Sequence, residues 1–354
     1  MIFKKKLNII YLMPAHKTAS GGSKYIYQKS ELINKLKING ISSQILHLKK
    51  KKTGKILQSL KKRIFKKKSN KYGWDVGDMK AAGSFIPSSS WTENKISIKK
   101  DINFNPKTDF VIIPEIWAHF ACQLLIKKKI KYAILAQGVY HMNSFYNHKK
   151  LSEAYTKAKI ILTISEDTSK CIKLIYQNCK NKIFKINITI DSKKFVSASK
   201  KNLITFMPRK LGDHYHILSL FLFNKLPKKW KIESLSNLSE KNLFLKLCQS
   251  KVFLSFSHLE GFGMPPLEAA IAGNKVIGYT GEGGKEYWKK PIFEEIESGN
   301  IKKFSEVVIN IVNNFPKNWN KKTLFQRKKL MDTYSKNRQK KLVIQLINKI
   351  KSFY

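Results

Sequence analysis

The sequence predicts an α/β protein made of two Rossmann-like domains, each a parallel sheet whose strands are linked by helical crossovers. Two observations carry this prediction. Short apolar runs, typical of buried strands, alternate with longer amphipathic runs, typical of helices, over most of the chain. The chain also has 354 residues, which exceeds a single typical core, so two domains are expected.

The first half alternates between strands and helices from residue 7 onward. A Ser20-Gly21-Gly22 turn follows the first strand, and Gly40 ends the first helix. Strands are expected at 7–13, 43–48, 109–114, 132–136 and 160–164, and helices at about 23–39, 116–127, 152–157 and 165–176. This alternation favours a parallel sheet with right-handed crossovers.

A lysine-rich block interrupts this half at residues 49–71, where twelve basic residues and no acid occupy 23 positions. Like charges repel, so the block cannot bury itself and is expected to leave the core. Its apolar residues recur at helical spacing, which is typical of a basic amphipathic helix on anionic lipid. A solvated loop is the alternative.

The second half repeats the alternation. Strands are expected at 203–207, 231–235, 251–256 and from 276, and helices at 213–224, 239–248, 301–313 and, as one or two segments, 323–350. A further helix begins at Pro265 and Pro266 and ends at Gly273, because proline is tolerated in a first turn and glycine is a common helix stop.

The stretch from Glu260 to Glu268 carries most of the functional information. A buried strand leads into a Gly-rich turn and a helix N-terminus, an arrangement that binds anions at the carboxyl edge of a parallel sheet. With Glu260 in the loop and Glu268 in the first helical turn, two carboxylates can accept hydrogen bonds from hydroxyls in the same pocket. A ligand with phosphates and several hydroxyls is best described as a nucleotide sugar.

The alternative is an ordinary strand, turn and helix with one capping and one solvated glutamate. The distribution of acids argues against it. Of the 23 acidic residues, seven lie between residues 258 and 300, although the chain is otherwise rich in lysine.

The segment Glu260-Gly-Phe-Gly-Met-Pro-Pro-Leu-Glu268, followed by a second Gly-rich turn at 278–287, resembles the donor-sugar motif of retaining GT-B glycosyltransferases of family 4. The resemblance implies that Glu260 and the backbone of Gly261, Phe262 and Gly263 contact the transferred sugar. It also implies that Glu268 holds the nucleotide ribose.

The resemblance also implies the layout of the chain. In that family the two domains face each other across a cleft, with the acceptor bound by the first and the donor by the second. Residues 183–190 are similar to the crossover strand, which places a first domain at 1–190 and a second at 191–330. The last helix, at 331–354, is then expected to pack back on the first domain, and Gly21 and Gly22 to approach the donor phosphates.

Arg209 and Lys210 end the first strand of the second domain. Two fixed cations there would stabilise the negative charge that develops as the nucleotide leaves, a role that an Arg and a Lys have in the resembled family. Glu260, Arg209 and Lys210 are therefore the expected catalytic residues. No Asp-x-Asp metal clamp is present, so neither metal nor cofactor is expected. A solvated basic turn is the alternative.

Polar residues at strand ends of the first domain are candidates for acceptor binding. They are Glu115, His119, Gln137, Tyr140 and His141. A histidine after an apolar strand is also often a packed or capping residue, and this is the alternative for His119 and for His141.

The net charge of +46 is extreme. It indicates either a polyanionic partner, with an anionic membrane surface preferred over nucleic acid, or a lysine bias of the whole proteome. The four cysteines have no metal-ligand spacing and are expected to be reduced thiols. The longest apolar region, residues 110–126, contains Pro114, Glu115 and His119 and is no membrane span. A cytoplasmic protein is expected, peripheral on the inner face of the membrane if the charge is functional.

The sequence thus predicts a glycosyltransferase that moves a sugar from a nucleoside diphosphate sugar to a hydroxyl of a surface glycan, such as lipopolysaccharide, or of a lipid-linked acceptor. The resemblance implies retention. The alternatives are a GT-B sugar-nucleotide epimerase and a non-catalytic polyanion- or membrane-binding protein on a GT-B scaffold.

Overall fold

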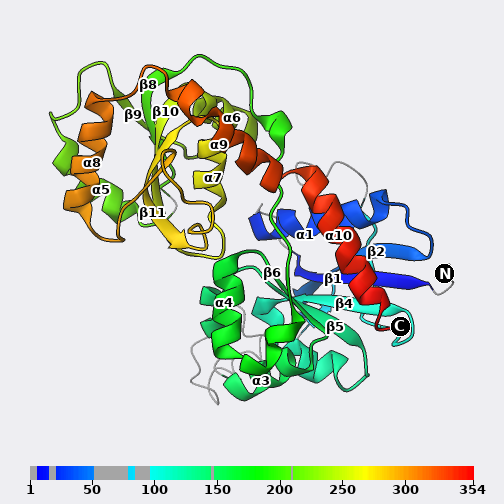
Figure 1. Ribbon diagram of the computed structural model, residues 1–354. Coiled ribbons are helices and arrows are strands. Elements are labelled where there is room, and N and C mark those ends of the chain that lie inside the picture. Colours follow the sequence, from blue (N-terminus) through cyan, green and yellow to red (C-terminus); the bar gives the residue numbers. More distant parts are fainter. Residues whose placement is uncertain (1–5, 16–20, 52–78, 84–95, 145–146, 209) are drawn as a thin grey trace. The chain divides into compact units, whose positions relative to one another are not determined.

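The computed structural model describes residues 6–15, 21–51, 79–83, 96–144, 147–208 and 210–354, and the chain divides into two compact units. The first unit contains residues 1–164, 168–186 and 340–354, and the second contains residues 165–167 and 187–339 (Figure 1). The end of the chain therefore belongs to the same unit as its beginning.

The described residues of the first unit form a seven-stranded sheet with the order β3-β2-β1-β4-β5-β6-β7. Its strands are β1 (Leu7–Pro14), β2 (Ile41–Lys50), β3 (Met79–Ala81), β4 (Asp109–Pro114), β5 (Lys131–Ala136), β6 (Ile160–Thr163) and β7 (Ile183–Lys185). β3 is antiparallel to β2, and the other neighbours are parallel. Every residue of β4 is buried, as the continuous apolar run predicts for a strand covered on both faces.

The helices of this unit are α1 (Gly21–Lys35), α3 (His148–Lys157) and α4 (Glu166–Ile175), with short turns η3 (Glu115–Trp117), η5 (Val139–Ser144), η6 (Gln177–Lys182) and the π-helix η4 (Ala121–Leu125). The helix expected at 116–127 is thus broken into η3 and η4. Trp117, Phe120 and Leu125 from this segment all lie in the core.

Two other strands of this half differ in length from the expected ones. The crossover strand expected at 183–190 is regular only over Ile183–Lys185. β2 extends to Lys50, where it pairs with Met79, so the lysine-rich block begins inside the sheet. The remainder of that block, from residue 52 on, lies outside the described residues.

The last helix, α10 (Lys336–Lys351), carries a buried apolar stripe with helical spacing, made of Val343, Leu346, Ile347 and Ile350. The residues after it dock on the first sheet. The Phe353 ring stacks on Phe110 at 6.3 Å, and the Tyr354 hydroxyl donates to the carbonyl of Asp109. These contacts attach the chain end to β4.

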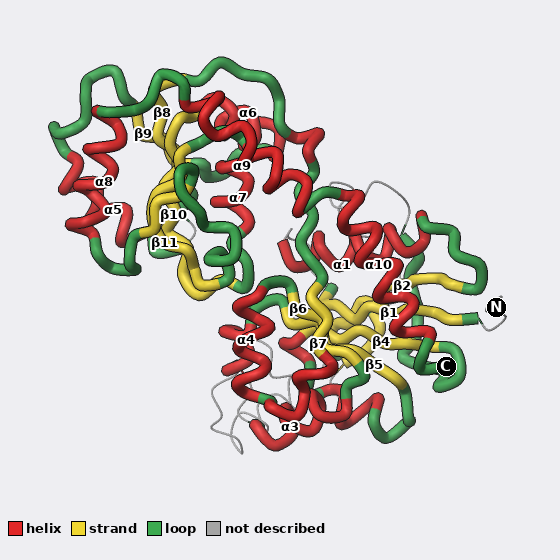
Figure 2. The backbone as a smooth tube through the Cα atoms, in the orientation of Figure 1, coloured by secondary structure: helices red, strands yellow, loops and turns green. Residues whose placement is uncertain are grey.

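The second unit has a five-stranded parallel sheet with the order β12-β11-β10-β8-β9. Its strands are β8 (Lys201–Phe206), β9 (Lys231–Ser234), β10 (Ser250–Glu260), β11 (Lys275–Glu282) and β12 (Phe293–Glu295). Its helices are α5 (Gly212–Leu222), α6 (Glu240–Gln249), α7 (Met264–Ile271), α8 (Ile301–Asn313) and α9 (Trp319–Thr333). Figure 2 shows α5 and α8 on one face of the sheet and α6, α7 and α9 on the other, so the sheet is covered on both sides.

Candidate functional site

The strand order of the second unit determines where a ligand can bind. Counted along the chain, the order is 2-1-3-4-5, so the crossovers leave β8 and β10 in opposite directions. The loops after these two strands separate, and ligands of open α/β sheets bind in the resulting crevice at the carboxyl ends. Here Met207, Pro208 and Lys210 follow β8, and Gly261, Phe262 and Gly263 follow β10.

A lysine from one loop and a glutamate from the other meet at this point. The Lys210 Nζ lies 2.8 Å from Glu260 Oε1 and 3.5 Å from the carbonyl of His258. The two side chains are 30% and 23% exposed, so a ligand can reach both. An ammonium and a carboxylate in contact can separate around a ligand, the first toward a phosphate and the second toward sugar hydroxyls.

A bulge presents Glu260 at the end of β10. The pairing of β10 with β11 shifts between Ser257 and Glu260, and Leu259 takes a left-handed φ of 42°. Beyond the bulge, Glu260 pairs with Glu282. Bulges of this kind redirect a side chain where a strand ends, often next to active sites.

The two Gly-rich turns pack against each other behind the pair. A Cβ on Gly283 would lie 2.3 Å from the backbone of Gly261, which no side chain can tolerate. Gly263 has a φ of 78° and precedes α7. The glycines therefore permit a close approach of two backbone segments.

Phe262 contributes its backbone alone to this turn. Its ring is buried and lies 5.3 Å from the rings of Tyr287 and Tyr334. Its side chain therefore belongs to the core, and donor contact by Phe262 would have to come from its peptide groups.

The helix after the turn differs from the expectation in two ways. α7 begins at Met264, before the prolines, so Glu268 lies in the second turn and not in the first. Pro265 and Pro266 have no N–H, which leaves fewer free donors at this N-terminus than an ordinary helix offers. The backbone contribution to an anion site is correspondingly smaller, and the charge of Lys210 matters more.

Tyr287 is buried behind the first Gly-rich turn. Its hydroxyl is fully buried and donates to the carbonyl of Gly263. Burial raises the pKa of Tyr287 well above its ordinary value, and the negative charges of Glu260 and Glu268 act in the same direction. Both carboxylates thus lie within electrostatic range of one hydroxyl. Sequence reasoning did not select Tyr287, although it ends the second Gly-rich segment.

A pocket of about 540 Å³ opens beside the pair, along the carboxyl ends of β10, β11 and β12. It is lined by Ser257, His258, Leu259, Tyr279, Thr280, Gly281, Glu282, Lys285, Glu295, Ile296, Glu297 and Ser298. Carboxylates and hydroxyls dominate this lining, and Lys285 is paired with Glu282 at 2.9 Å. Such a surface suits the hydroxyls of a sugar better than a phosphate.

The first unit has its own switch point, between β1 and β4. Glu115 follows β4 directly and is buried. Burial raises the pKa of Glu115 to about 7, even though the backbone N–H groups of Gln137 and Gly138 bond to it and act in the opposite direction. A carboxyl group that titrates near neutrality can hold or release a proton under ordinary conditions.

Gln137 also joins this point to the first helix. Its side chain donates to the carbonyl of Gly22 at 3.1 Å, and a Cβ on Gly22 would lie 2.9 Å from its amide oxygen. Gly22 is thus a position of close approach, and Gly21 is the first residue of α1. Glu115, Gln137 and Gly22 therefore lie together at the carboxyl edge of the first sheet.

The remaining candidates lie elsewhere or outside the description. His119 is buried with its ring 4.3 Å from that of Phe120, which is the environment of a packed histidine. Tyr140 and His141 lie on η5, and the side chain of His141 is outside the described part of the chain. Arg209 is outside it as well.

Within the described ranges, no group of three or more His, Cys, Asp or Glu side chains could hold a metal ion. Among the helices described, none combines the length and the apolar character needed to span a bilayer. None of the four cysteines, all of which are among the described residues, is part of a disulfide.

Comparison with known proteins identifies the fold. No family model and no curated protein sequence matches the chain. Sucrose-phosphate synthase from Thermosynechococcus elongatus has a TM-score of 0.66 at 10% identity, over 99% of this chain and 100% of that one. A glycosyltransferase from Rickettsia africae has a TM-score of 0.60 at 16% identity, over 98% of both chains.

A third similar structure is Anabaena HepE in complex with UDP and glucose, with a TM-score of 0.61 at 10% identity, over 98% of this chain and 100% of that one. All three cover nearly the whole chain. The protein therefore has the GT-B fold, as the sequence predicted.

Proposed function

We propose that the protein is a glycosyltransferase that uses a nucleoside diphosphate sugar as donor. The observation that carries the proposal is the contact between Lys210 and Glu260 at the switch point of the second sheet. The cation suits the diphosphate of such a donor, and the carboxylate suits the hydroxyls of its sugar. The complex of the similar HepE with UDP and glucose supports this choice.

The residues of the second unit have separate roles in this proposal. Lys210, with Arg209, neutralises the diphosphate as its bond to the sugar breaks. Glu260 accepts hydrogen bonds from hydroxyls of the transferred sugar, and Glu268 accepts those of the ribose. Gly261 and Gly263 allow the sugar to approach the backbone between the two carboxylates.

The acceptor is a hydroxyl of a glycan or of a lipid-linked intermediate in this proposal. Its oxygen bonds to the anomeric carbon on the face from which the phosphate leaves, and the phosphate takes the acceptor proton, so configuration is retained. Glu115, with its pKa near 7, positions the acceptor hydroxyl in the first unit together with Gln137.

Donor turnover tests the proposal directly. The protein is incubated with UDP, GDP, dTDP and ADP sugars, with and without membrane extract from its source, and nucleotide release is measured. Release from one donor that increases with extract is the expected result. Release that extract does not change would favour the epimerase alternative, and no release from any donor would contradict the transfer proposal.

A matched pair of variants tests the site itself. Lys210→Met removes the cation of the 2.8 Å pair, and turnover should fall by about a hundredfold, the usual cost of one charge-stabilising group. Lys246→Met removes a comparable pair with Glu233, which joins α6 to β9 away from the crevice. The control should keep its activity. Equal losses in both variants would contradict the assignment.

We further propose that the protein acts at an anionic membrane surface on its cytoplasmic side. Ile217, Leu220 and Phe223 are exposed at three-residue spacing along α5 and its end, with Leu220 and Phe223 more than 70% exposed. Lys225 and Lys228 follow them and are also exposed. Apolar residues flanked by lysines bind lipid with anionic headgroups, which face the cytoplasm.

Vesicle flotation tests this second proposal. Binding to vesicles with phosphatidylserine should exceed binding to neutral vesicles and should weaken when Leu220 and Phe223 are both replaced by Asp. Leu174→Asp changes an equally exposed leucine on α4 and should leave binding unchanged. Binding that is insensitive to the double variant would remove α5 from the interface.

A further inference from the structure

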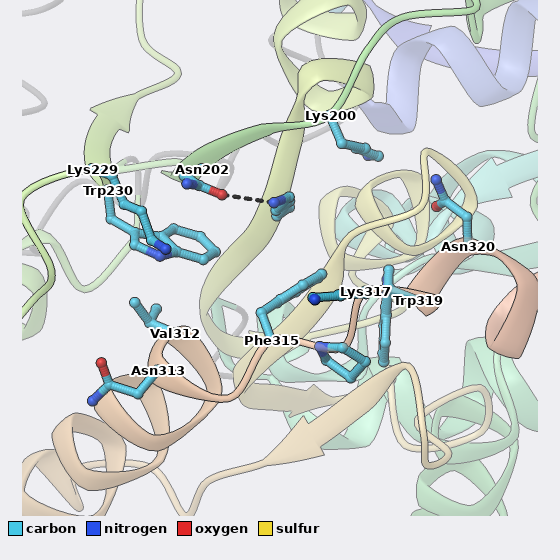
Figure 3. Close-up of a pocket in the computed structure, with 12 residues that line it drawn as sticks. Lys200, Asn202, Lys229, Trp230, Val312, Asn313, Phe315, Lys317, Trp319 and Asn320 are labelled. Atoms are coloured by element: carbon cyan, nitrogen blue, oxygen red, sulfur yellow. Dashed lines mark hydrogen bonds between the residues drawn. The ribbon is translucent and has the colours of Figure 1, made fainter.

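The second unit contains another pocket at the opposite edge of its sheet (Figure 3). Its volume is about 340 Å³, and it is lined by Lys200, Asn202, Lys229, Trp230, Lys251, Val312, Asn313, Phe315, Pro316, Lys317, Trp319 and Asn320. Lys251 is the second residue of β10 and Glu260 is the last, so the two pockets are roughly 30 Å apart along the strand. This pocket cannot be part of the Lys210–Glu260 site.

Three aromatic rings from separate segments form its frame. Trp230 precedes β9, Phe315 connects α8 to α9, and Trp319 is the first residue of α9. The Phe315 ring lies 6.0 Å from Trp230 and 5.5 Å from Trp319, and Figure 3 shows the three around one hollow. The Trp319 indole N–H donates to the carbonyl of Gly273 at 3.0 Å. The rings are therefore held in place before any ligand arrives.

One lysine is positioned by these rings. The Lys251 ammonium bonds to the Asn202 side chain at 2.6 Å and lies 5.8 Å from the ring centroid of Trp230 and 5.5 Å from that of Phe315. Lys229 and Lys317 are exposed at the rim. No Asp or Glu is among the described residues that line the pocket. The pocket therefore presents positive charge without a carboxylate to neutralise it.

Lys200 has a different role. Its Nζ donates to the carbonyls of Ser250 and Ala272, both at 2.7 Å, and burial lowers its pKa to about 7. Because its hydrogen bonds are used by the backbone, Lys200 supports the floor of the pocket. The cations that remain for a ligand are Lys229, Lys251 and Lys317.

The amide side chains and the rings of the pocket favour an anionic saccharide over a nucleic acid. Asn313 and Asn320 are exposed at the rim, and an amide both donates and accepts hydrogen bonds, as hydroxyl groups require. A phosphodiester backbone offers mainly acceptors. The two tryptophans are each only 7% exposed, which leaves too little open ring face for bases to stack. The C–H groups of a sugar ring can use the smaller ring surface that remains.

We propose that this pocket binds an acidic saccharide, with its charged groups on Lys229, Lys251 and Lys317 and its ring against Phe315. The proposal depends on these residues and not on the transfer activity. A polymeric glycan held here and at the carboxyl edge would bind more tightly than at either place alone.

Binding of sulfated dextran hexasaccharide, followed by tryptophan fluorescence and calorimetry, tests the proposal. The double variant Lys251→Met with Lys317→Met should weaken binding at least about tenfold, because each charge-assisted contact contributes on that scale. The control is Lys127→Met with Lys128→Met, which removes the same charge from an exposed segment of the first unit. It should change binding less than about twofold.

Two further probes separate sugar recognition from charge. Phe315→Ala should weaken binding of the sulfated hexasaccharide but not binding of inorganic polyphosphate. The neutral hexasaccharide should bind the wild type far more weakly than the sulfated one. Equal weakening by the two double variants would show unspecific attraction to a basic protein and overturn the proposal. Tighter, pocket-dependent binding of oligo-dT would overturn it in favour of a nucleic acid. If Phe315→Ala does not fold, Lys317→Met alone, at an exposed position, still tests whether the pocket binds the charged groups of the ligand, and unchanged binding by this variant would contradict the proposal.

Discussion

Replacing Glu115 by glutamine should remove a pH dependence of the free energy of unfolding. Glu115 is buried at the end of β4, and burial raises its pKa from 4.5 to about 7. Below pH 4.5 the folded and the unfolded chain both carry the proton. As the pH rises toward 7, the unfolded chain loses the proton while the folded chain keeps it, so stability falls across this interval.

The size of the effect follows from the two pKa values. The interval from 4.5 to about 7 corresponds to roughly 3 kcal/mol, at 1.36 kcal/mol for each pH unit. Above pH 7 both states have lost the proton and no further change is expected. Glutamine has the same shape and no titratable proton, so the variant should lack this component.

Urea unfolding of the wild type and of Glu115→Gln at pH 5, 6, 7 and 8 measures the effect. The wild type should lose stability relative to the variant between pH 5 and 7, and the difference should then be constant. Glu306→Gln, at an exposed position on α8, is the control and should show no such trend. A wild-type-to-variant difference that is the same at pH 5 and pH 8 would refute the assignment of a protonated Glu115.

Three other substitutions have definite expected outcomes. Glu260→Gln should lower turnover far more than nucleotide affinity, measured by steady-state kinetics and calorimetry, and equal losses would remove its contact with the sugar. Gly283→Ala should lower the free energy of unfolding, measured in urea, by about 1–3 kcal/mol and should weaken donor binding, because its Cβ would lie 2.3 Å from Gly261. Gly212→Ala is the control and should be neutral, because the space around Gly212 is open. Phe353→Ala should destabilise the first unit by about 1–2 kcal/mol through loss of its stacking on Phe110, and an unchanged urea midpoint would show that the chain end contributes no stability.

The pattern of apolar residues was sufficient for the fold class and for most strands. It failed at residues 116–127, where the chain is apolar nearly all round and a period of 3.6 cannot be distinguished from a locally rewound helix. The start of α7 was also misplaced, because the left-handed conformation of Gly263 lets the helix begin before the prolines. Such details depend on tertiary packing, which overrides local preference.

Lys210 and Glu260 were selected from the sequence, but not their contact. They are 50 positions apart, and they meet because β8 and β10 are neighbours in the sheet although β9 lies between them in the chain. Likewise, the burial of Glu115 and the inward ring of Phe262 depend on segments distant in sequence. The pocket around Lys251 combines three such segments, and its lysines do not stand out in a chain with 69 basic residues.

The return of α10 to the first unit has a consequence during synthesis. Residues 1–186 leave the ribosome first, but residues 340–354 follow only after the about 150 residues between them. At 5 to 20 residues per second, this delay is roughly 8 to 30 s. Until then the surface that Val343, Leu346, Ile347 and Ile350 will cover is open to water. The nascent first unit therefore passes through a stage at which a chaperone can bind it, and a chain that terminates early would remain in that aggregation-prone state.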